Sequence, residues 1–365
     1  MILYVIAVAI SMICATYANN VKNIKSLKTT YKALCVLAFL PTTLVSVFRF
    51  QVGTDWSIYD DYFHWISKGM DKFSEPLFNL LNRVVYVFTQ DSWWLFAICA
   101  ILIGGFTYRA IMEQSVNPAF SILIFMISGD YFNSQNQIRQ AIAMAIFLYA
   151  IKYMKSRDWK RYFFWLVIAL LIHTSAIIYF PLYFLYGKKV HVRLLISLYG
   201  VLVVALPVMK KVIVFVLTKT KYAWYFDSVY NTNDFYLLGF LFTVFFIVIL
   251  FFYYCYAENE ALKKGKTRDE IQDYDFNIML YTYYLAAVTV LYSAVVPQMV
   301  RITTGFSIVT SLLMPRLVMR EHKRNRRIVL YMLIVVVFTV KFLYDVYCNG
   351  WYDAIPYQSI FFKRG

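Results

Sequence analysis

Four arginines stand apart from the clusters of basic residues and lie near the ends of apolar segments: Arg49, Arg83, Arg139 and Arg301. Arg139 follows a polar run that opens an apolar segment, and Arg301 follows a Pro-Gln pair closely. A guanidinium group offers a rigid fork of donors that suits phosphate oxygens, and the first turn of a helix adds free N–H groups. Several such arginines converging on one cavity would bind a diphosphate without a metal ion. The alternative for each is a side chain that reaches to lipid headgroups.

The segment 48–75 combines acidic and aromatic residues in a way that is typical of a sugar-binding surface. Aromatic rings stack on the C–H faces of sugars, and carboxylates accept hydrogen bonds from sugar hydroxyls. The candidate sugar ligands are Trp56, Tyr59, Asp60 and, from the polar run before Arg139, Asn136.

Asp55 and His173 are the two titratable residues whose positions suggest a role. Asp55 follows a Gly-Thr pair, where a tight turn would fix its direction, although it would equally cap a helix that begins at Trp56. His173 is the only histidine that we predict within the membrane, next to Thr174 and Ser175. An isolated histidine between apolar helices is also often a hydrogen-bonding residue of the core.

Metal ligands are not clustered in this sequence. Asp273 and Asp275 form a DxD pattern, but at the start of an apolar segment we interpret it as a solvated turn. The five cysteines are scattered and form no CxxC pattern, so they indicate neither a metal site nor a disulfide framework. We expect no metal and no cofactor.

The composition places these residues in a membrane protein. Of 365 residues, 61% are apolar and only 15% are charged, against about 25% charged in soluble domains. Apolar runs long enough to span a bilayer as helices recur along the whole chain. They lie at 1–18, 30–47, 92–110, 117–132, 137–154, 194–216, 236–256, 277–297, 302–319 and 328–346. We therefore predict one all-α integral membrane domain, 1–365, with about 10–12 spans and short re-entrant or interfacial helices.

The net charge of +16 comes largely from loops that would lie on one side of the membrane if the ten spans alternate. Lysine and arginine in short loops mark the cytoplasmic side, so both termini are expected outside. Some attraction to anionic membrane lipids is also expected. Because the charge reports topology, we do not expect nucleic acid as a partner.

Two segments do not fit simple alternation. Residues 161–187 lie between two basic clusters and are too few for two full spans, so we predict a membrane-embedded helical hairpin that turns near His173. The alternative is one long tilted helix. We expect an outer loop with a short helix at 48–91, a second outer loop at 218–235 and a cytoplasmic loop at 257–276.

Several stretches taken together resemble the EpsG family of Wzy-type polymerases of bacterial surface polysaccharides. They are RFQVGTDWSIYDDYF, EPLFNLL, FNSQNQIRQAIAMAIFLYAIKYMK, IHTSAIIYFPLYFL and VRITTGFSI, in this order over about residues 45–310. The Val-Gly-Thr-Asp pattern and the Asn-x-Ile-Arg-Gln block are the most specific of these.

The resemblance implies an architecture like that of the GT-C glycosyltransferases, in a bacterial cytoplasmic membrane with the active site on its outer side. It implies transfer of a growing glycan from undecaprenyl diphosphate to the non-reducing end of an incoming lipid-linked repeat unit. A chain-length regulator and a flippase of the same pathway are its expected partners. On this basis Asp55 or His173 would be the general base, while the diphosphate would be held by Arg139, Arg301, Arg49 and Gln140, the last orienting Arg139.

Other classes of membrane protein remain as alternatives. A flippase for lipid-linked oligosaccharides would also be basic and multispanning, but we see no internal repeat. Another lipid-donor glycosyltransferase or ligase would share the arginines. A membrane O-acyltransferase would place a histidine within a helix, as His173 is, but we find no second motif of that class. A purely structural membrane protein would not need outer arginines beside polar residues.

Overall fold

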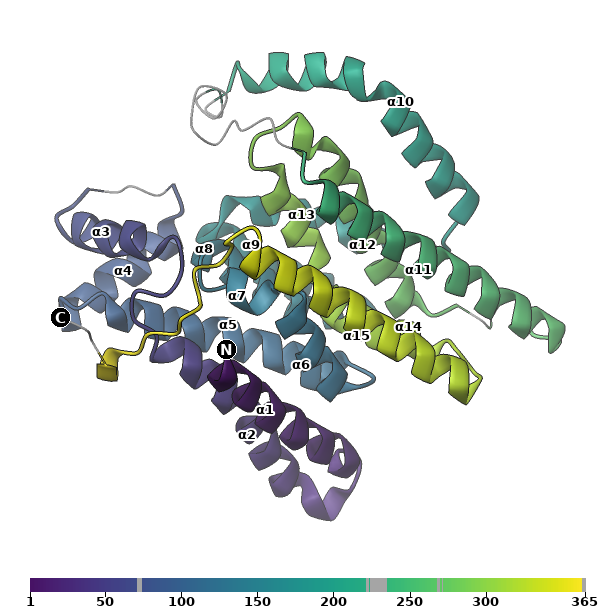
Figure 1. Cartoon of the computed structure of the whole chain (residues 1–365), viewed down its shortest axis with the longest axis horizontal. Helices are drawn as coiled ribbons and strands as arrows, with labels where there is room; N and C mark the ends of the chain where they lie inside the picture. Colours follow the sequence, from purple (N-terminus) through teal and green to yellow (C-terminus); the bar gives the residue numbers. More distant parts are fainter. Residues whose placement is uncertain (71–73, 221–222, 224–234, 268–269, 271, 363–365) are drawn as a thin grey trace. The chain divides into compact units, whose positions relative to one another are not determined.

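The computed structural model describes residues 1–70, 74–220, 223, 235–267, 270 and 272–362. Within these residues the chain is helical, and its only β-pairing is an isolated bridge between Arg49 and Ser359 (Figure 1). The predicted all-α class is confirmed. The predicted outer loop at 218–235 lies mostly outside the described residues.

The chain folds into two compact units, where the sequence predicts a single domain. The first unit comprises Met1–Tyr183, Thr310–Arg316 and Ile328–Gly365. Its elements are α1 (Ile2–Val21), η1 (Lys25–Leu27), α2 (Lys28–Val47), α3 (Trp56–Ser67), α4 (Pro76–Phe88), α5 (Trp93–Gln114), α6 (Pro118–Ile127), α7 (Asp130–Asn133), α8 (Ile138–Lys155), α9 (Trp159–Ile172), most of η2 (Thr174–Leu185), most of α14 (Thr310–Met319), most of α15 (Arg324–Tyr347) and η5 (Ile360–Phe362).

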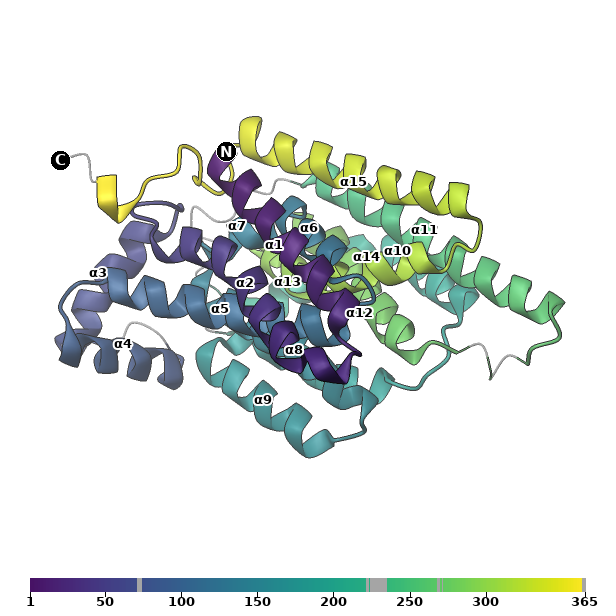
Figure 2. The ribbon, with the colours of Figure 1, turned by 90° about the horizontal axis from the view of Figure 1, so that it is seen from below.

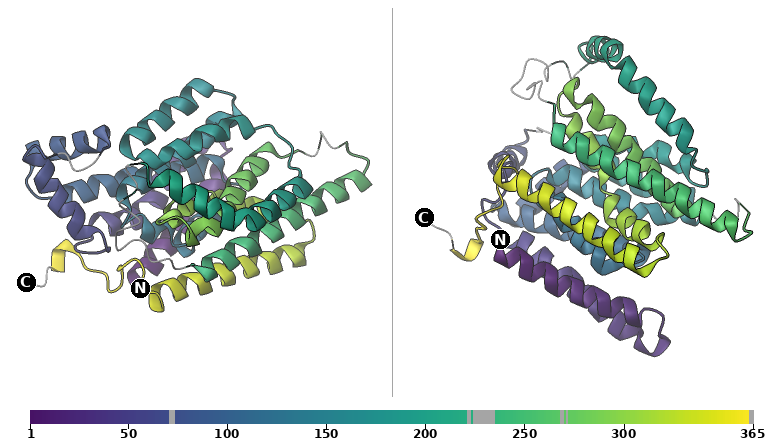
Figure 3. Two further views of the ribbon diagram at one scale, coloured as in Figure 1. Left: turned by 90° about the horizontal axis from the view of Figure 1, so that it is seen from above. Right: turned by 45° about the vertical axis from the view of Figure 1, so that its right-hand side comes forward.

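The second unit comprises Phe184–Val309 and Leu317–Arg327. It contains α10 (Val192–Leu217), α11 (Leu237–Lys263), α12 (Tyr274–Leu291), η4 (Tyr292–Ala294), α13 (Met299–Ser307) and the end of α14 (Thr310–Met319). In this unit α12 packs against α10, α11 and α13. Leu195 is the one buried residue of α10, so the other apolar side chains of this helix suit contact with lipid. Figure 3 gives two further views of this helix, drawn in teal.

Among the described residues, six helices are long and apolar enough to span a membrane, or seven if the bent pair α13 and α14 forms one span. This makes the chain a multi-pass membrane protein, with fewer clear spans than the expected 10–12. The predicted span at 117–132 is divided between α6 and α7, and α8 carries Arg139, Lys152 and Lys155 within 18 residues.

Helix α8 forms the centre of the first unit, where it packs against α5 and α9 (Figure 2). Nearly all of its side chains are buried, from Ile138 through Met154. The middle of α8, from Ala141 to Ile151, is apolar on all sides, and such a helix is stable only inside a protein or a bilayer. The surrounding helices therefore fix the direction of α8 and with it the position of Arg139 in its first turn.

Residues 161–187 form two short helices, α9 and η2, rather than one long helix. His173 between them has an extended backbone. The chain reverses there, because the Tyr162 hydroxyl donates to the Tyr179 carbonyl at 2.7 Å and the Tyr183 hydroxyl donates to the Arg157 carbonyl at 3.2 Å. Whether this hairpin lies within the membrane stays a prediction.

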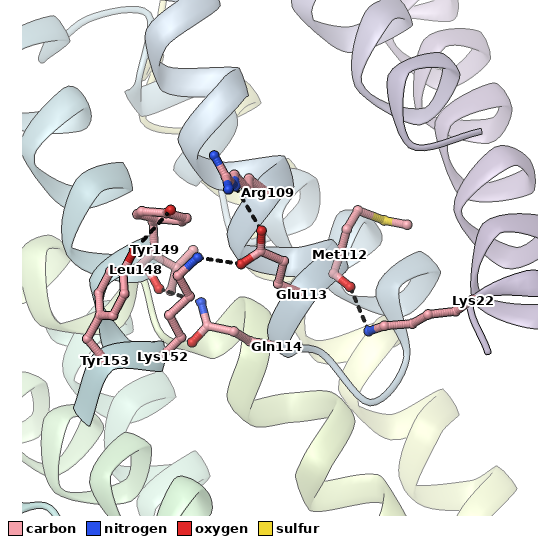
Figure 4. A network of polar contacts seen from close by, with 9 residues as sticks. All are labelled: Lys22, Arg109, Met112, Glu113, Gln114, Leu148, Tyr149, Lys152 and Tyr153. Carbon is pink, nitrogen blue, oxygen red and sulfur yellow. Dashed lines mark hydrogen bonds and ion pairs between the residues drawn. The ribbon is translucent and has the colours of Figure 1, made fainter. Parts of the chain in front are cut away.

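Lys22, Arg109 and Lys152 are three of the basic residues that would lie on the cytoplasmic side if the ten predicted spans alternate. They belong to one polar network of the first unit (Figure 4). Glu113 accepts hydrogen bonds from Arg109 Nε at 2.8 Å and from Lys152 Nζ at 2.6 Å. Lys22 Nζ donates to the Met112 carbonyl at 3.0 Å. Lys152 is 13 residues beyond Arg139 in α8, so the two side chains begin about 20 Å apart along the helix axis. Arg139 therefore lies at the opposite end of α8 from this network.

Candidate functional site

The carboxylate of Glu75 is the point at which three distant segments of the first unit meet. Its Oε2 accepts a hydrogen bond from Arg139 Nη1 at 2.8 Å. Its Oε1 lies 3.3 Å from His173 Nδ1, and it accepts from the backbone N and the side-chain Oγ1 of Thr174, each at 3.3 Å. The side chain of Glu75 is only 4% exposed, whereas those of Arg139 and His173 are each 20% exposed. The carboxylate therefore lies inside, with part of the guanidinium and of the imidazole accessible from outside.

Local structure explains how each group is placed. Glu75 precedes α4, whose first residue is Pro76, and proline is favoured there because the first helical N–H needs no partner within the helix. Arg139 belongs to the first turn of α8, at the positive end of its dipole. His173 ends α9, where the extended backbone turns the imidazole and the N–H of Thr174 toward Glu75. Contacts of α4 with α9 bring the segments together.

The electrostatics of the cluster favour an ionised Glu75. Burial of the carboxyl raises its pKa, but the hydrogen bond with His173 and the charge of Arg139 outweigh burial and lower the pKa from 4.5 to about 2. Glu75 is thus an anion at neutral pH, and it holds its two cationic or polar neighbours in fixed positions.

This pKa predicts an acid-sensitive contribution to stability. The pKa of Glu75 is depressed in the folded state, so its contribution is fully present above about pH 4.5 and is lost as the pH falls toward 2. We expect the thermal stability of the purified protein to fall more steeply in this window than that of the Glu75→Gln variant. Equal slopes for the two proteins would contradict the ionised, paired state of Glu75.

Two aromatic residues complete the surroundings of Arg139. The guanidinium carbon lies 5.9 Å from the ring centroid of Phe78. Burial raises the pKa of Tyr59, while the charge and hydrogen bonding of Arg139 lower it, which places the Tyr59 hydroxyl next to this arginine. Tyr59 is only 6% exposed, so it supports Arg139 instead of presenting an open ring face to a sugar.

Asp55 lies at the start of α3, which begins at Trp56 as the capping alternative requires. Its carboxylate nevertheless accepts no capping hydrogen bond from the helix. Asp55 is half-buried, and its negative charge raises the pKa of Tyr59. Helix capping alone therefore does not explain why the residue at this position is an aspartate.

Arg49 and Asn136 hold the loop before α3 against the turn before α8. Arg49 Nη1 donates to the Gln135 carbonyl at 2.6 Å. The Asn136 Oδ1 accepts from Thr54 N at 2.7 Å, and its Nδ2 donates to the Tyr352 carbonyl at 3.2 Å. These hydrogen bonds hold both side chains inside the protein, so we include neither residue in the proposed substrate site.

Gly53 explains why this loop approaches so closely. Its φ is +107°, and a Cβ at this position would lie 2.5 Å from Asn136 Oδ1. Only glycine combines this backbone conformation with that approach. The Val-Gly-Thr-Asp pattern and the polar run before Arg139 are therefore two sides of one contact.

Three further candidate site residues, Trp56, Gln140 and Asp60, have their surroundings within the protein defined by the structure. The Trp56 ring stacks on Phe96 with centroids 3.7 Å apart, and Gln140 is 3% exposed within α8. Asp60 accepts a hydrogen bond from the Ser92 hydroxyl and lies 3.9 Å from His64 Nε2. Trp56 is buried at 8% exposed, and its predicted contact with a sugar stays a prediction.

Arg301 lies in the first turns of α13, in the second unit. Its approach to Arg139 stays a prediction. The DxD pattern of the same unit has local contacts: Asp273 accepts the capping hydrogen bond from Phe276 N at 3.0 Å, and Asp275 accepts from the Tyr186 hydroxyl at 2.9 Å. These contacts agree with a turn at the start of α12.

Glu75 is the residue of this site that sequence reasoning missed. The signal was present, because Glu75 is one of only 20 acidic residues and opens a short amphipathic segment that also resembles the EpsG pattern. Its partners are 64 and 99 residues away in the chain, so the spacing of residues does not reveal the cluster.

Together, the fold and this site define a multi-pass, all-α membrane protein in which a buried carboxylate holds an arginine beside a histidine. The sequence model of the EpsG family matches residues 32–359, and the chain belongs to this family of Wzy-type polymerases. No curated protein and no solved structure matches the chain.

Proposed function

We propose that the protein polymerises lipid-linked repeat units of a bacterial surface polysaccharide at the outer face of the cytoplasmic membrane. Membership of the EpsG family supports a polymerase. The observation that carries the proposal for the site is the convergence of Arg139, His173 and Thr174 on buried Glu75. It combines a phosphate ligand and a proton acceptor, the two groups that a metal-independent transfer from a lipid diphosphate requires.

The proposed reaction joins two lipid-linked molecules. The non-reducing-end hydroxyl of the incoming unit loses its proton to a base and forms a bond with the anomeric carbon of the growing glycan. The bond between that carbon and the diphosphate oxygen breaks, and undecaprenyl diphosphate leaves with the electron pair. Arg139 would stabilise the negative charge that develops on the leaving diphosphate, with Arg301 as a second proposed ligand. Each new linkage should release one undecaprenyl diphosphate.

His173 is the base that the geometry favours. Glu75 Oε1 lies 3.3 Å from His173 Nδ1, and a carboxylate in this position favours the tautomer with the proton on Nδ1 and the acceptor lone pair on Nε2. Nε2 would then accept the proton of the sugar hydroxyl, and Glu75 would stabilise the imidazolium that forms. Asp55 is the second candidate, because it is a half-buried carboxylate at the start of α3.

Paired substitutions distinguish the two bases. His173→Gln should lower the initial rate of chain extension by about 10²–10⁴-fold, the usual contribution of a general base. Asp55→Asn should lower it by less than about tenfold, because an asparagine keeps the size of the side chain and is equally favoured at the start of a helix. The measurement is the initial rate with purified protein and a lipid-linked repeat unit. The reverse order of effects would assign the base to Asp55.

A further inference from the structure

Arg49 is a buried cation with neutral partners. Its side chain is among the most buried polar groups of the first unit, at 2% exposed. Nη1 donates to the carbonyls of Gln135 at 2.6 Å and Val52 at 3.5 Å. The guanidinium carbon also lies 5.5 Å from the Phe96 ring centroid and 5.6 Å from that of Trp56. Within the described part of the chain, Arg49 forms no ion pair with a carboxylate.

Such a charge is costly to bury without an anion. An unpaired ion inside a protein loses several kcal/mol of hydration, by order of magnitude, and two carbonyls with two ring faces recover part of it. Arginine does not escape this cost by losing its proton: burial lowers the pKa of Arg49 only to about 10. The guanidinium remains charged at neutral pH.

A cavity of about 20 Å³ adjoins this guanidinium. Its polar lining includes Thr43, Ser46, Tyr131 and Gln135, and the lining contains no carboxylate. Among the described residues, neither Arg49 Nε nor Thr43 Oγ1 has a hydrogen-bond partner, although both are fully buried. Arg49 and Thr43, which carry these two unsatisfied donors, both line this small cavity.

We propose that this cavity binds one chloride-sized monovalent anion, held by Arg49 Nε and the Thr43 hydroxyl. The volume admits one small occupant, and a monovalent anion would neutralise the one charge in the lining. Gln135 Oε1 also lacks a partner among the described residues. The amide in its opposite orientation would instead present N–H groups to the anion.

The anion would act on the turn that leads to Arg139. Arg49 fixes the carbonyl of Gln135, which lies three residues before the start of α8. Neutralising Arg49 would stabilise this turn and the loop before α3 together. The inference is independent of the reaction proposed above, because it concerns the stability of the first unit.

Replacing chloride tests the proposal. Thermal unfolding of the purified full-length protein should be compared in sodium chloride and in sodium gluconate at constant ionic strength. Between one tenth of its Kd and ten times its Kd, chloride should lower the apparent unfolding constant by about tenfold. Bromide should replace chloride and give an anomalous scattering peak beside Arg49. Equal stability in chloride and gluconate would overturn the proposal and leave water as the occupant.

Variants locate the effect. Arg49→Gln should remove the chloride dependence, whereas Arg109→Gln should retain it, because Arg109 is 61% exposed and belongs to the network with Glu113. If Arg49→Gln does not fold, Thr43→Val decides the question, because it keeps the charge but removes one proposed donor. An unchanged chloride midpoint in Thr43→Val, or a persistent dependence in Arg49→Gln, would contradict this site.

Discussion

Glu75→Gln is expected to lower the rate of chain extension by about 10²–10⁴-fold. The amide keeps the size of the side chain but loses the charge that pairs with Arg139 at 2.8 Å. It would also offer an N–H to His173 Nδ1, which favours the tautomer with a protonated Nε2 and removes the base. The measurement is the initial rate with a purified lipid-linked repeat unit over a range of pH, together with the thermal stability of the variant.

Glu113→Gln is the matched control for this substitution. Glu113 also holds two basic side chains, Arg109 and Lys152, but its side chain is 34% exposed and belongs to the network at the other end of α8. We expect this variant to polymerise at the normal rate. A positioning role of Glu75 also predicts an altered pH profile in Glu75→Gln, which a loss of stability alone would not produce. A folded Glu75→Gln protein with a normal rate and profile would contradict the role of Glu75.

Arg139→Lys should lower the rate by about 10²–10³-fold, the usual cost of losing one preorganised donor to a developing charge. Lysine keeps the positive charge but presents a point charge instead of a planar fork. It would therefore maintain an ion pair with Glu75 while losing the geometry proposed for the diphosphate. Chain length in a complemented deletion strain and the rate of the purified variant both measure this effect.

Arg109→Lys provides the comparison, because Arg109 pairs with Glu113 at 2.8 Å, the same distance as in the pair of Arg139 with Glu75. Arg109 is 61% exposed, and exposed pairs contribute at most about 1 kcal/mol. We expect normal polymer from this variant. Normal chain length from Arg139→Lys as well would remove the diphosphate role of Arg139.

Helix positions could be predicted from the sequence because apolar runs of span length are a local property. The predicted runs 30–47 and 92–110 correspond to α2 (Lys28–Val47) and α5 (Trp93–Gln114). The break in the helix at His173 could also be predicted, since the 27-residue segment 161–187 lies between two basic clusters. The number of spans was harder to predict from the sequence, because one predicted run is divided into α6 and α7 at Ser128 and Gly129.

The environment of each arginine could not be predicted in the same way. Arg49 follows an apolar segment and Arg139 opens one. Both carry a guanidinium group, which is suited to binding phosphate. Burial separates them: Arg49 binds the carbonyl of Gln135 inside the unit, while Arg139 stays 20% exposed beside Glu75. That difference depends on contacts between segments more than 60 residues apart, which no local pattern records.

The same non-local contacts explain why separate motifs resemble one family. The EPLFNLL stretch contributes Glu75, the Asn-x-Ile-Arg-Gln block contributes Arg139, and the IHTS stretch contributes His173 and Thr174. In the first unit these stretches meet at one carboxylate. The sequence identified the motifs, and their packing identifies the site.

Reconstitution with a purified undecaprenyl-diphosphate-linked repeat unit tests the central claim most directly. The protein in liposomes should convert this substrate into a ladder of products at multiples of one repeat, with one undecaprenyl diphosphate released for each linkage, and Glu75→Gln should reduce both signals together. Unchanged substrate transported across the bilayer without a ladder would contradict the account and identify a flippase instead.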